Sequence, residues 1–132
     1  MNKTILLLTS DPVVRSVFQE VLERGGYLVL AAGDLGTAVD RLKESRPDLL
    51  IISSYIESIP GYDAATFLRT KCRGLCVLMV GGLIEDDRLQ YRMTLKGFEV
   101  FPKPFAAAAF LEKVDSVLRK VPNEHIASAV SE

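Results

Sequence analysis

The stretch PDLLIISS, residues Pro47 to Ser54, decides how the chain folds. Four consecutive Leu and Ile residues follow Asp48, and two serines then end the apolar run. An uninterrupted apolar run of this length next to a proline predicts a strand that is buried on both faces of a sheet. Such a strand would end at Ser53 and bring a hydroxyl group to the edge of the sheet.

Apolar runs of the same kind recur along the chain, and a helical pattern separates each run from the next. Asp11 and Pro12 suit the N-cap and the first turn of a helix. We expect strands at residues 4–8, 27–32, 48–53, 75–80 and 98–101. Helices are expected to start at Pro12, after Asp34 and at Asp63, to cover residues 85–96, and to end near Lys120. This alternation predicts an α/β protein with a doubly wound, five-stranded parallel sheet.

The composition is that of one ordinary globular domain. The chain has 132 residues, of which 48% are hydrophobic and 25% charged, and its net charge is −1. A net charge of −1 gives no sign of the basic surface that nucleic-acid binding requires. No apolar run approaches the roughly 20 residues that span a membrane. The N-terminus lacks the apolar region of a secretory signal, so we expect a cytoplasmic protein. Residues 1–121 are expected to form the domain, and residues 122–132 a flexible C-terminal tail.

The two cysteines, Cys72 and Cys76, are expected to be buried or half-buried side chains. A structural zinc site requires about four ligands, and the only histidine is His125 in the expected tail. We therefore expect neither a metal ion nor another cofactor.

In a doubly wound sheet, the functional site lies beyond the carboxyl ends of the strands. The groups expected there follow the first, third, fourth and fifth strands, and they are Thr9, Ser10, Asp11, Ser53, Ser54, Gly81, Gly82 and Lys103. Most of these groups are hydroxyls or glycines, and only one of them is a carboxylate.

Three short stretches resemble motifs of the response-regulator receiver domains (CheY-like) of bacterial two-component systems. They are TSDPVVR at residues 9–15, RPDLLIIS followed by PGYDA at residues 46–53 and 60–64, and FPKPF at residues 101–105. The resemblance covers about residues 3–120. It implies a flavodoxin-like sheet with strand order 2-1-3-4-5 and a role in phosphorelay signal transduction.

The resemblance also implies that most of the family's functional positions are altered in this chain. The two acidic residues that bind Mg²⁺ fall on Thr9 and Ser10, and Asp11 matches the acidic position next to them. The phosphoacceptor aspartate falls on Ser53 when counted from Pro47, or on Ile56 when counted back from Pro60. The remaining matches are the switch hydroxyl at Gly81, the aromatic switch near Phe101, and the retained lysine and cis-proline at Lys103 and Pro104.

These substitutions remove the chemistry that the family uses. Mg²⁺ prefers hard, charged oxygen ligands, and only Asp11 or Glu57 could supply a carboxylate. A serine hydroxyl needs a neighbouring base to become a nucleophile. We therefore predict a degenerate receiver, a pseudo-receiver, in which Ser53 ends the strand and accepts no phosphate. It is expected to act without catalysis, by protein contact.

Two alternative functions remain open. Lys103 could belong to an anion or small-ligand site at the expected crevice, or only fix the turn into the last helix. Phosphate could also be accepted at an unorthodox residue.

Two features point to protein partners. The loop at residues 54–59 carries three exposed-looking apolar residues, Tyr55, Ile56 and Ile59, which would cover the altered site or present a contact. The resemblance implies a partner surface formed by the fourth helix, fifth strand and fifth helix, which Ala106–Ala109 would let another helix approach. A sensor kinase, an effector or a second copy in a homodimer would bind there, with no role for nucleic acid or membrane.

Overall fold

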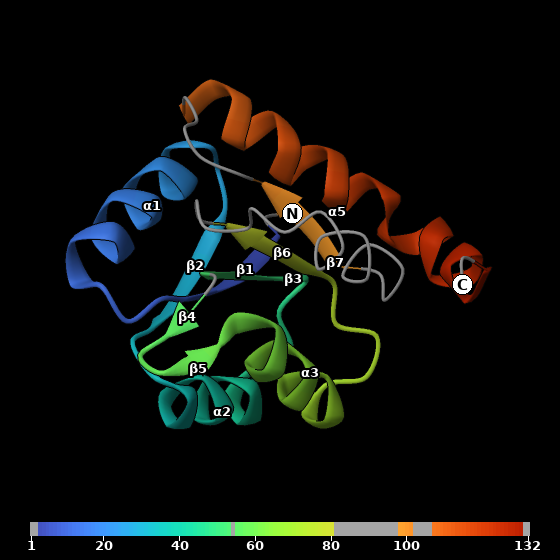
Figure 1. The fold of residues 1–132 in the computed structure, drawn as a ribbon. Helices are drawn as coiled ribbons and strands as arrows, with labels where there is room; N and C mark the ends of the chain where they lie inside the picture. Colours follow the sequence, from blue (N-terminus) through green and yellow to red (C-terminus); the bar gives the residue numbers. More distant parts are fainter. Residues whose placement is uncertain (1–2, 54, 81–97, 102–106, 131–132) are drawn as a thin grey trace.

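The structure is a computed structural model of the chain, and it describes residues 3–53, 55–80, 98–101 and 107–130 (Figure 1). For residues 98–101 and 120–130 the description covers the backbone alone. The helix predicted at residues 85–96 lies outside the described residues.

A parallel sheet forms the centre of the molecule. Its strands lie in the order β2-β1-β3-β6-β7, and each neighbouring pair is parallel. The strands are β1 (Thr4–Leu8), β2 (Leu28–Ala32), β3 (Leu49–Ser53), β6 (Val77–Val80) and β7 (Phe98–Phe101). The predicted α/β class with a parallel central sheet is confirmed.

The described helices cover both faces of the sheet. Figure 1 shows α1 and α5 on one face and α2 and α3 on the other. Alternate residues of β1 face the two layers: Ile5 and Leu7 pack with α1 and α5, whereas Leu6 and Leu8 pack with α2 and α3. The helices are α1 (Pro12–Arg24), α2 (Leu35–Glu44), α3 (Gly61–Lys71) and α5 (Ala107–Val130). Two cores therefore lie on opposite faces of one sheet.

Aspartates cap the first two helices, as the sequence predicts. Asp11 Oδ1 accepts hydrogen bonds from the N–H groups of Val13 at 2.9 Å and Val14 at 3.3 Å. Asp34 Oδ1 accepts one from the N–H of Thr37 at 2.7 Å. The predicted start of the third helix at Asp63 is wrong, because α3 begins at Gly61 and Asp63 lies within its first turn.

Several other element bounds differ from the predictions. The strand expected from Leu75 begins at Val77, because the N–H of Leu75 bonds to the carbonyl of Cys72 and Gly74 adopts a φ of +78° in that turn. The helix expected to end near Lys120 continues through Val130. The flexibility of residues 122–132 stays a prediction.

Two apolar residues that match the helical pattern are not buried. Val17 is 53% exposed and Phe67 is 42% exposed. The buried stripe of α1 contains Phe18 and Leu22, so it is narrower than the run of valines suggests. No described helix is long and apolar enough to span a membrane.

Candidate functional site

The ends of β1 and β3 lie side by side at the carboxyl edge of the sheet. Leu8 pairs with Ile52, so that the next residues, Thr9 and Ser53, leave the two strands at the same level. Thr9 is only 3% exposed, and its N–H donates to the carbonyl of Ala32 at 3.2 Å. The structure therefore brings together Thr9, Ser10 and Ser53, the predicted site residues on these two strands.

Arg15 ties this edge together from α1. Its Nη1 donates to the carbonyl oxygen of Thr9 at 2.7 Å and lies close to Gly33, at the end of β2. A Cβ atom at Gly33 would approach this nitrogen to 2.9 Å, so a side chain there would displace the guanidinium group. In the sequence, Arg15 is only the last residue of the stretch TSDPVVR, because its partner is a backbone carbonyl that no sequence pattern reveals.

A short hairpin follows Ser53 and was not predicted. Its antiparallel strands are β4 (Tyr55–Ile56) and β5 (Ile59–Pro60). Ile56 is 1% exposed and belongs to the core cluster that contains Leu8 and Ile52, whereas Tyr55 is 54% exposed. The prediction of three exposed apolar residues is therefore wrong for Ile56, which anchors the hairpin in the core, and Ile59 is half-buried.

The hairpin also bonds to the hydroxyl groups at the carboxyl edge. The N–H of Glu57, in the turn of the hairpin, donates to Ser10 Oγ at 3.3 Å. Ser53 Oγ donates to the carbonyl oxygen of Tyr55 at 3.0 Å, so this hydroxyl makes a local hydrogen bond. The hydroxyls of Ser10 and Ser53 are thus bonded to the backbone of the hairpin, so the segment packs against the carboxyl edge of the sheet.

The two possible registers of the phosphoacceptor position fall in different places. Ser53 is the last residue of β3, opposite Val80 of β6, whereas Ile56 lies in β4 with a buried side chain. The residue at the strand end is therefore Ser53. Its assignment as the altered phosphoacceptor position stays a prediction.

The described residues at this edge do not fit a magnesium ion. Thr9, Ser10 and Ser53 carry neutral hydroxyls, and Oδ1 of Asp11 is occupied in capping α1. Glu57 is exposed, and its N–H rather than its carboxylate is the group bonded at this edge. No cluster of three or more His, Cys, Asp or Glu residues suited to a metal occurs in the part of the chain that the structure describes.

Several predicted positions are not tested. Gly81, Lys103 and Pro104 lie outside the described residues. Phe101 is the last residue of β7 and pairs with Val80, but only its backbone is described. The cysteines are as predicted, since Cys72 is buried and Cys76 is half-buried.

Comparison with known proteins identifies the class of protein that this fold defines. The family model of the response regulator receiver domain matches residues 5–115. The chain therefore belongs to the response regulator receiver domain family, a family of signalling modules.

Relatives of known role are longer than this chain. The alkaline phosphatase synthesis transcriptional regulatory protein PhoP of Bacillus subtilis is 26% identical over 120 residues, which are 91% of this chain and 50% of PhoP. The probable transcriptional regulatory protein TcrX of Mycobacterium tuberculosis is also 26% identical over 120 residues, 89% of this chain and 50% of TcrX. The chain thus spans about half the length of the curated relatives it matches.

Solved structures share the fold. The chemotaxis protein CheY4 of Vibrio cholerae matches 89% of this chain and 99% of its own with a TM-score of 0.78 and 18% identity. NtrX of Brucella abortus matches 98% of this chain and 30% of its own with a TM-score of 0.84 and 17% identity. At these identities the likeness concerns the fold alone.

Proposed function

We propose that this domain is an atypical receiver, a pseudo-receiver, which acts by protein contact and is not phosphorylated on an aspartate. The observation that carries the proposal is the bonding of the hairpin at the carboxyl edge. The hydroxyl of Ser53, at the end of β3, donates to the carbonyl of Tyr55, and Ser10 receives the N–H of Glu57. The sequence resemblance assigns the family's phosphoacceptor to Ser53 and one of its metal ligands to Ser10, so these bonds support the proposal.

The chemistry of the side chains supports this proposal. Phosphoryl transfer depends on neutralising the charge that spreads over the phosphoryl oxygens, and neutral hydroxyls do this poorly. A serine also needs a base to remove its proton. The only histidine, His125, lies near the far end of α5, in a segment whose side chains are not described. We therefore infer that signals pass through a binding surface, without phosphoryl chemistry.

The proposed partner surface contains β7, α5 and the helix expected at residues 85–96. Ala107 and Ala109, near the start of α5, are exposed, so that another helix could approach closely there. The partner would be a sensor kinase, an effector or a second copy of the domain. Relatives twice as long as this chain are named as transcriptional regulators, which favours an effector.

Thr9 supports a second candidate, an anion or small-ligand site. The residue is 3% exposed, yet its hydroxyl makes no hydrogen bond to any residue that the structure describes. A buried hydroxyl without a partner costs free energy, so it favours a ligand or a nearby donor. Lys103 would be the cation of such a site.

A titration followed by NMR separates the two candidates. If the domain is a pseudo-receiver, millimolar Mg²⁺ should leave the amide chemical shifts of Thr9, Ser10 and Ser53 unchanged. A conventional receiver domain treated in parallel should show changes in the amide shifts of its own site. Saturable shifts of these amides with Mg²⁺ would overturn the proposal. Shifts with inorganic phosphate that the Lys103→Met variant loses would instead establish the anion site.

A further inference from the structure

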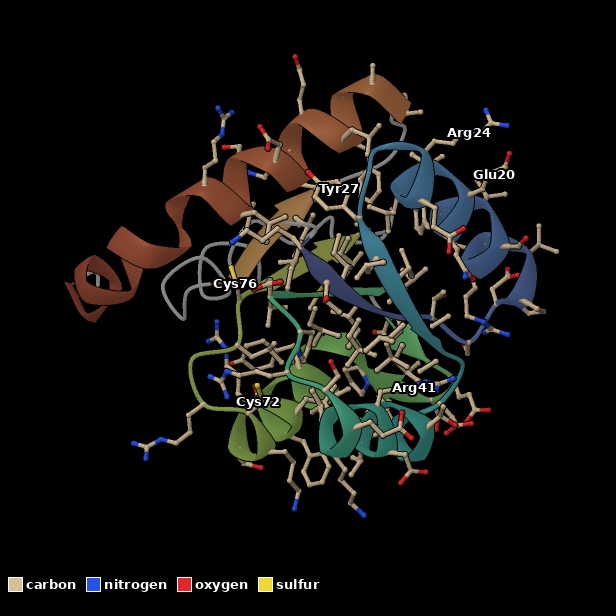
Figure 2. All side chains as sticks on the ribbon, turned by 180° about the vertical axis from the view of Figure 1, so that it is seen from behind. Glu20, Arg24, Tyr27, Arg41, Cys72 and Cys76 are labelled. Atoms are coloured by element: carbon tan, nitrogen blue, oxygen red, sulfur yellow. The ribbon has the colours of Figure 1, made fainter. Side chains whose placement is uncertain are left out.

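Four cationic residues surround the turn between α3 and β6. Figure 2 marks this region with Cys72 at the end of α3 and Cys76 just before β6. We call the group the basic surface, and its members are Arg46, Arg69, Lys71 and Arg73. Arg69 and Lys71 belong to the last turn of α3, whereas Arg46 precedes β3. Segments far apart in the sequence therefore contribute to one surface.

Backbone carbonyls of the turn hold two of these arginines in place. Arg46 Nη2 donates to the carbonyl oxygen of Arg73 at 2.6 Å, and Arg69 Nε donates to that of Leu75 at 2.9 Å. Gly74, between the two carbonyls, has a φ of +78°, which a residue with a side chain adopts only with strain. The guanidinium groups are thus ordered before any partner binds, which lowers the entropy lost on binding.

Three members of this surface, Arg46, Lys71 and Arg73, form no ion pair with another described residue. Described ion pairs join Arg24 to Glu20, Arg41 to Glu44, Lys43 to Asp40 and Arg119 to Asp115. Among the described residues, no carboxylate lies within 4.0 Å of the cationic groups of Arg46, Lys71 or Arg73. The carboxylate of Asp48, next to β3, instead accepts the N–H of Thr4 at 2.8 Å.

An exposed aromatic ring lies beside these charges. Phe67 precedes Lys71 by one helical turn and is 42% exposed. The Nζ atom of Lys71 lies 5.3 Å from the centre of the Phe67 ring, within the range of a cation–π contact. The surface therefore combines a cationic group with an apolar contact.

We propose that the basic surface binds an acidic segment of a partner protein that carries an apolar side chain next to its carboxylates. Guanidinium groups match the planar geometry of carboxylates, and arginine and aromatic residues dominate the energy of many interfaces. Duplex DNA typically engages roughly six to ten phosphate contacts, more than this surface offers. The net charge of −1 also gives no wider attraction for nucleic acid.

This surface is separate from α5, the described helix of the surface proposed for receiver signalling. The basic surface lies on the side of α3, whereas α5 covers the opposite face of the sheet (Figure 1). Either proposal can therefore fail without the other.

Fluorescence anisotropy with a labelled peptide of Glu and Asp residues around one Phe tests the proposal. We expect saturable binding that the Lys71→Glu/Arg73→Glu variant weakens by about tenfold or more, since like charges then face each other. The Arg24→Glu/Arg119→Glu variant is the matched control, because it reverses two exposed charges on the other face and should bind normally. Circular dichroism checks that both variants fold.

The peptide itself provides a test that does not depend on protein variants. Replacing its acids by Gln and Asn should abolish binding, and replacing its Phe by Ala should weaken it. Absence of binding by the acidic peptide, or equal weakening by both charge reversals, would overturn the proposal. Tighter binding of a single-stranded oligonucleotide that is lost in the Lys71→Glu/Arg73→Glu variant would overturn it in favour of nucleic acid.

Discussion

Asp34 shows how single acidic side chains are used in this chain. Its carboxylate caps α2, and the hydrogen bond from the backbone N–H of Thr37 holds the pKa of Asp34 below its usual range, with help from the nearby charge of Arg15. Asp11 has the same capping role at α1. Near the carboxyl edge, the acidic side chain of Asp11 thus stabilises the start of a helix.

The capping bond of Asp34 predicts a pH-dependent effect. Because the folded-state pKa lies below the unfolded one, the stabilisation is present at neutral pH, above the unfolded pKa, and is lost as the pH falls through the folded pKa. Asp34→Ala should therefore destabilise the domain at pH 7, and the difference from the wild type should shrink below about pH 4. Urea unfolding across this range measures it. The control variant Asp40→Ala, at an exposed site within α2, should lose less stability. A loss of stability in Asp34→Ala that does not change with pH would contradict the capping account.

Glu57 is the one described non-glycine residue with a positive φ, at 58°. A left-handed conformation costs an L-residue about 1–2 kcal/mol, and glycine adopts it without this strain. Glu57→Gly should therefore stabilise the domain by about 0.5–1 kcal/mol. This gain is smaller than the strain that is relieved, because glycine also increases the conformational entropy of the unfolded chain. Ser58→Gly, next to it in the turn, should destabilise it. Thermal unfolding measures both, and destabilisation by Glu57→Gly would show that the turn has another conformation.

At the scale of elements, the sequence predicted the strands of the parallel sheet but not the hairpin between β3 and α3. The parallel strands were predictable because their apolar runs are buried on both faces. The hairpin was not, because its turn lacks the Asn-Gly or Asp-Gly pair that usually marks one. The burial of Ile56 depends on its place in a core cluster that contains Leu8, a residue distant along the chain. The site hydroxyls were predictable because they follow the predicted strands in the sequence, but their bonds to the hairpin were not.

The anchoring of the hairpin gives a prediction at this scale. Ile56→Ala removes a fully buried side chain and should lower the free energy of unfolding by about 2–5 kcal/mol. Tyr55→Ala, next to it but exposed, should cost under about 1 kcal/mol. Chemical denaturation measures both variants. Similar losses in the two variants would mean that the hairpin is not anchored through Ile56.

The whole molecule combines a receiver fold with a carboxyl edge that carries hydroxyl groups. The two cores and the parallel sheet are those expected of the family, and the matched family model covers most of the chain. At the ends of β1 and β3, the hydroxyls of Ser10 and Ser53 are bonded to the hairpin. The scaffold is thus retained, and this supports a role based on binding.

Treatment with acetyl phosphate and Mg²⁺, followed by intact-mass spectrometry, tests this account most directly. We predict no adduct of one phosphoryl group, because the strand end carries a hydroxyl bonded to the hairpin and no suitable metal ligands. A conventional receiver domain treated in parallel should gain the adduct, which shows that the reagent is active. A stoichiometric adduct that maps to Ser53, Asp11 or Glu57 would contradict the account and establish phosphorylation at an unorthodox residue.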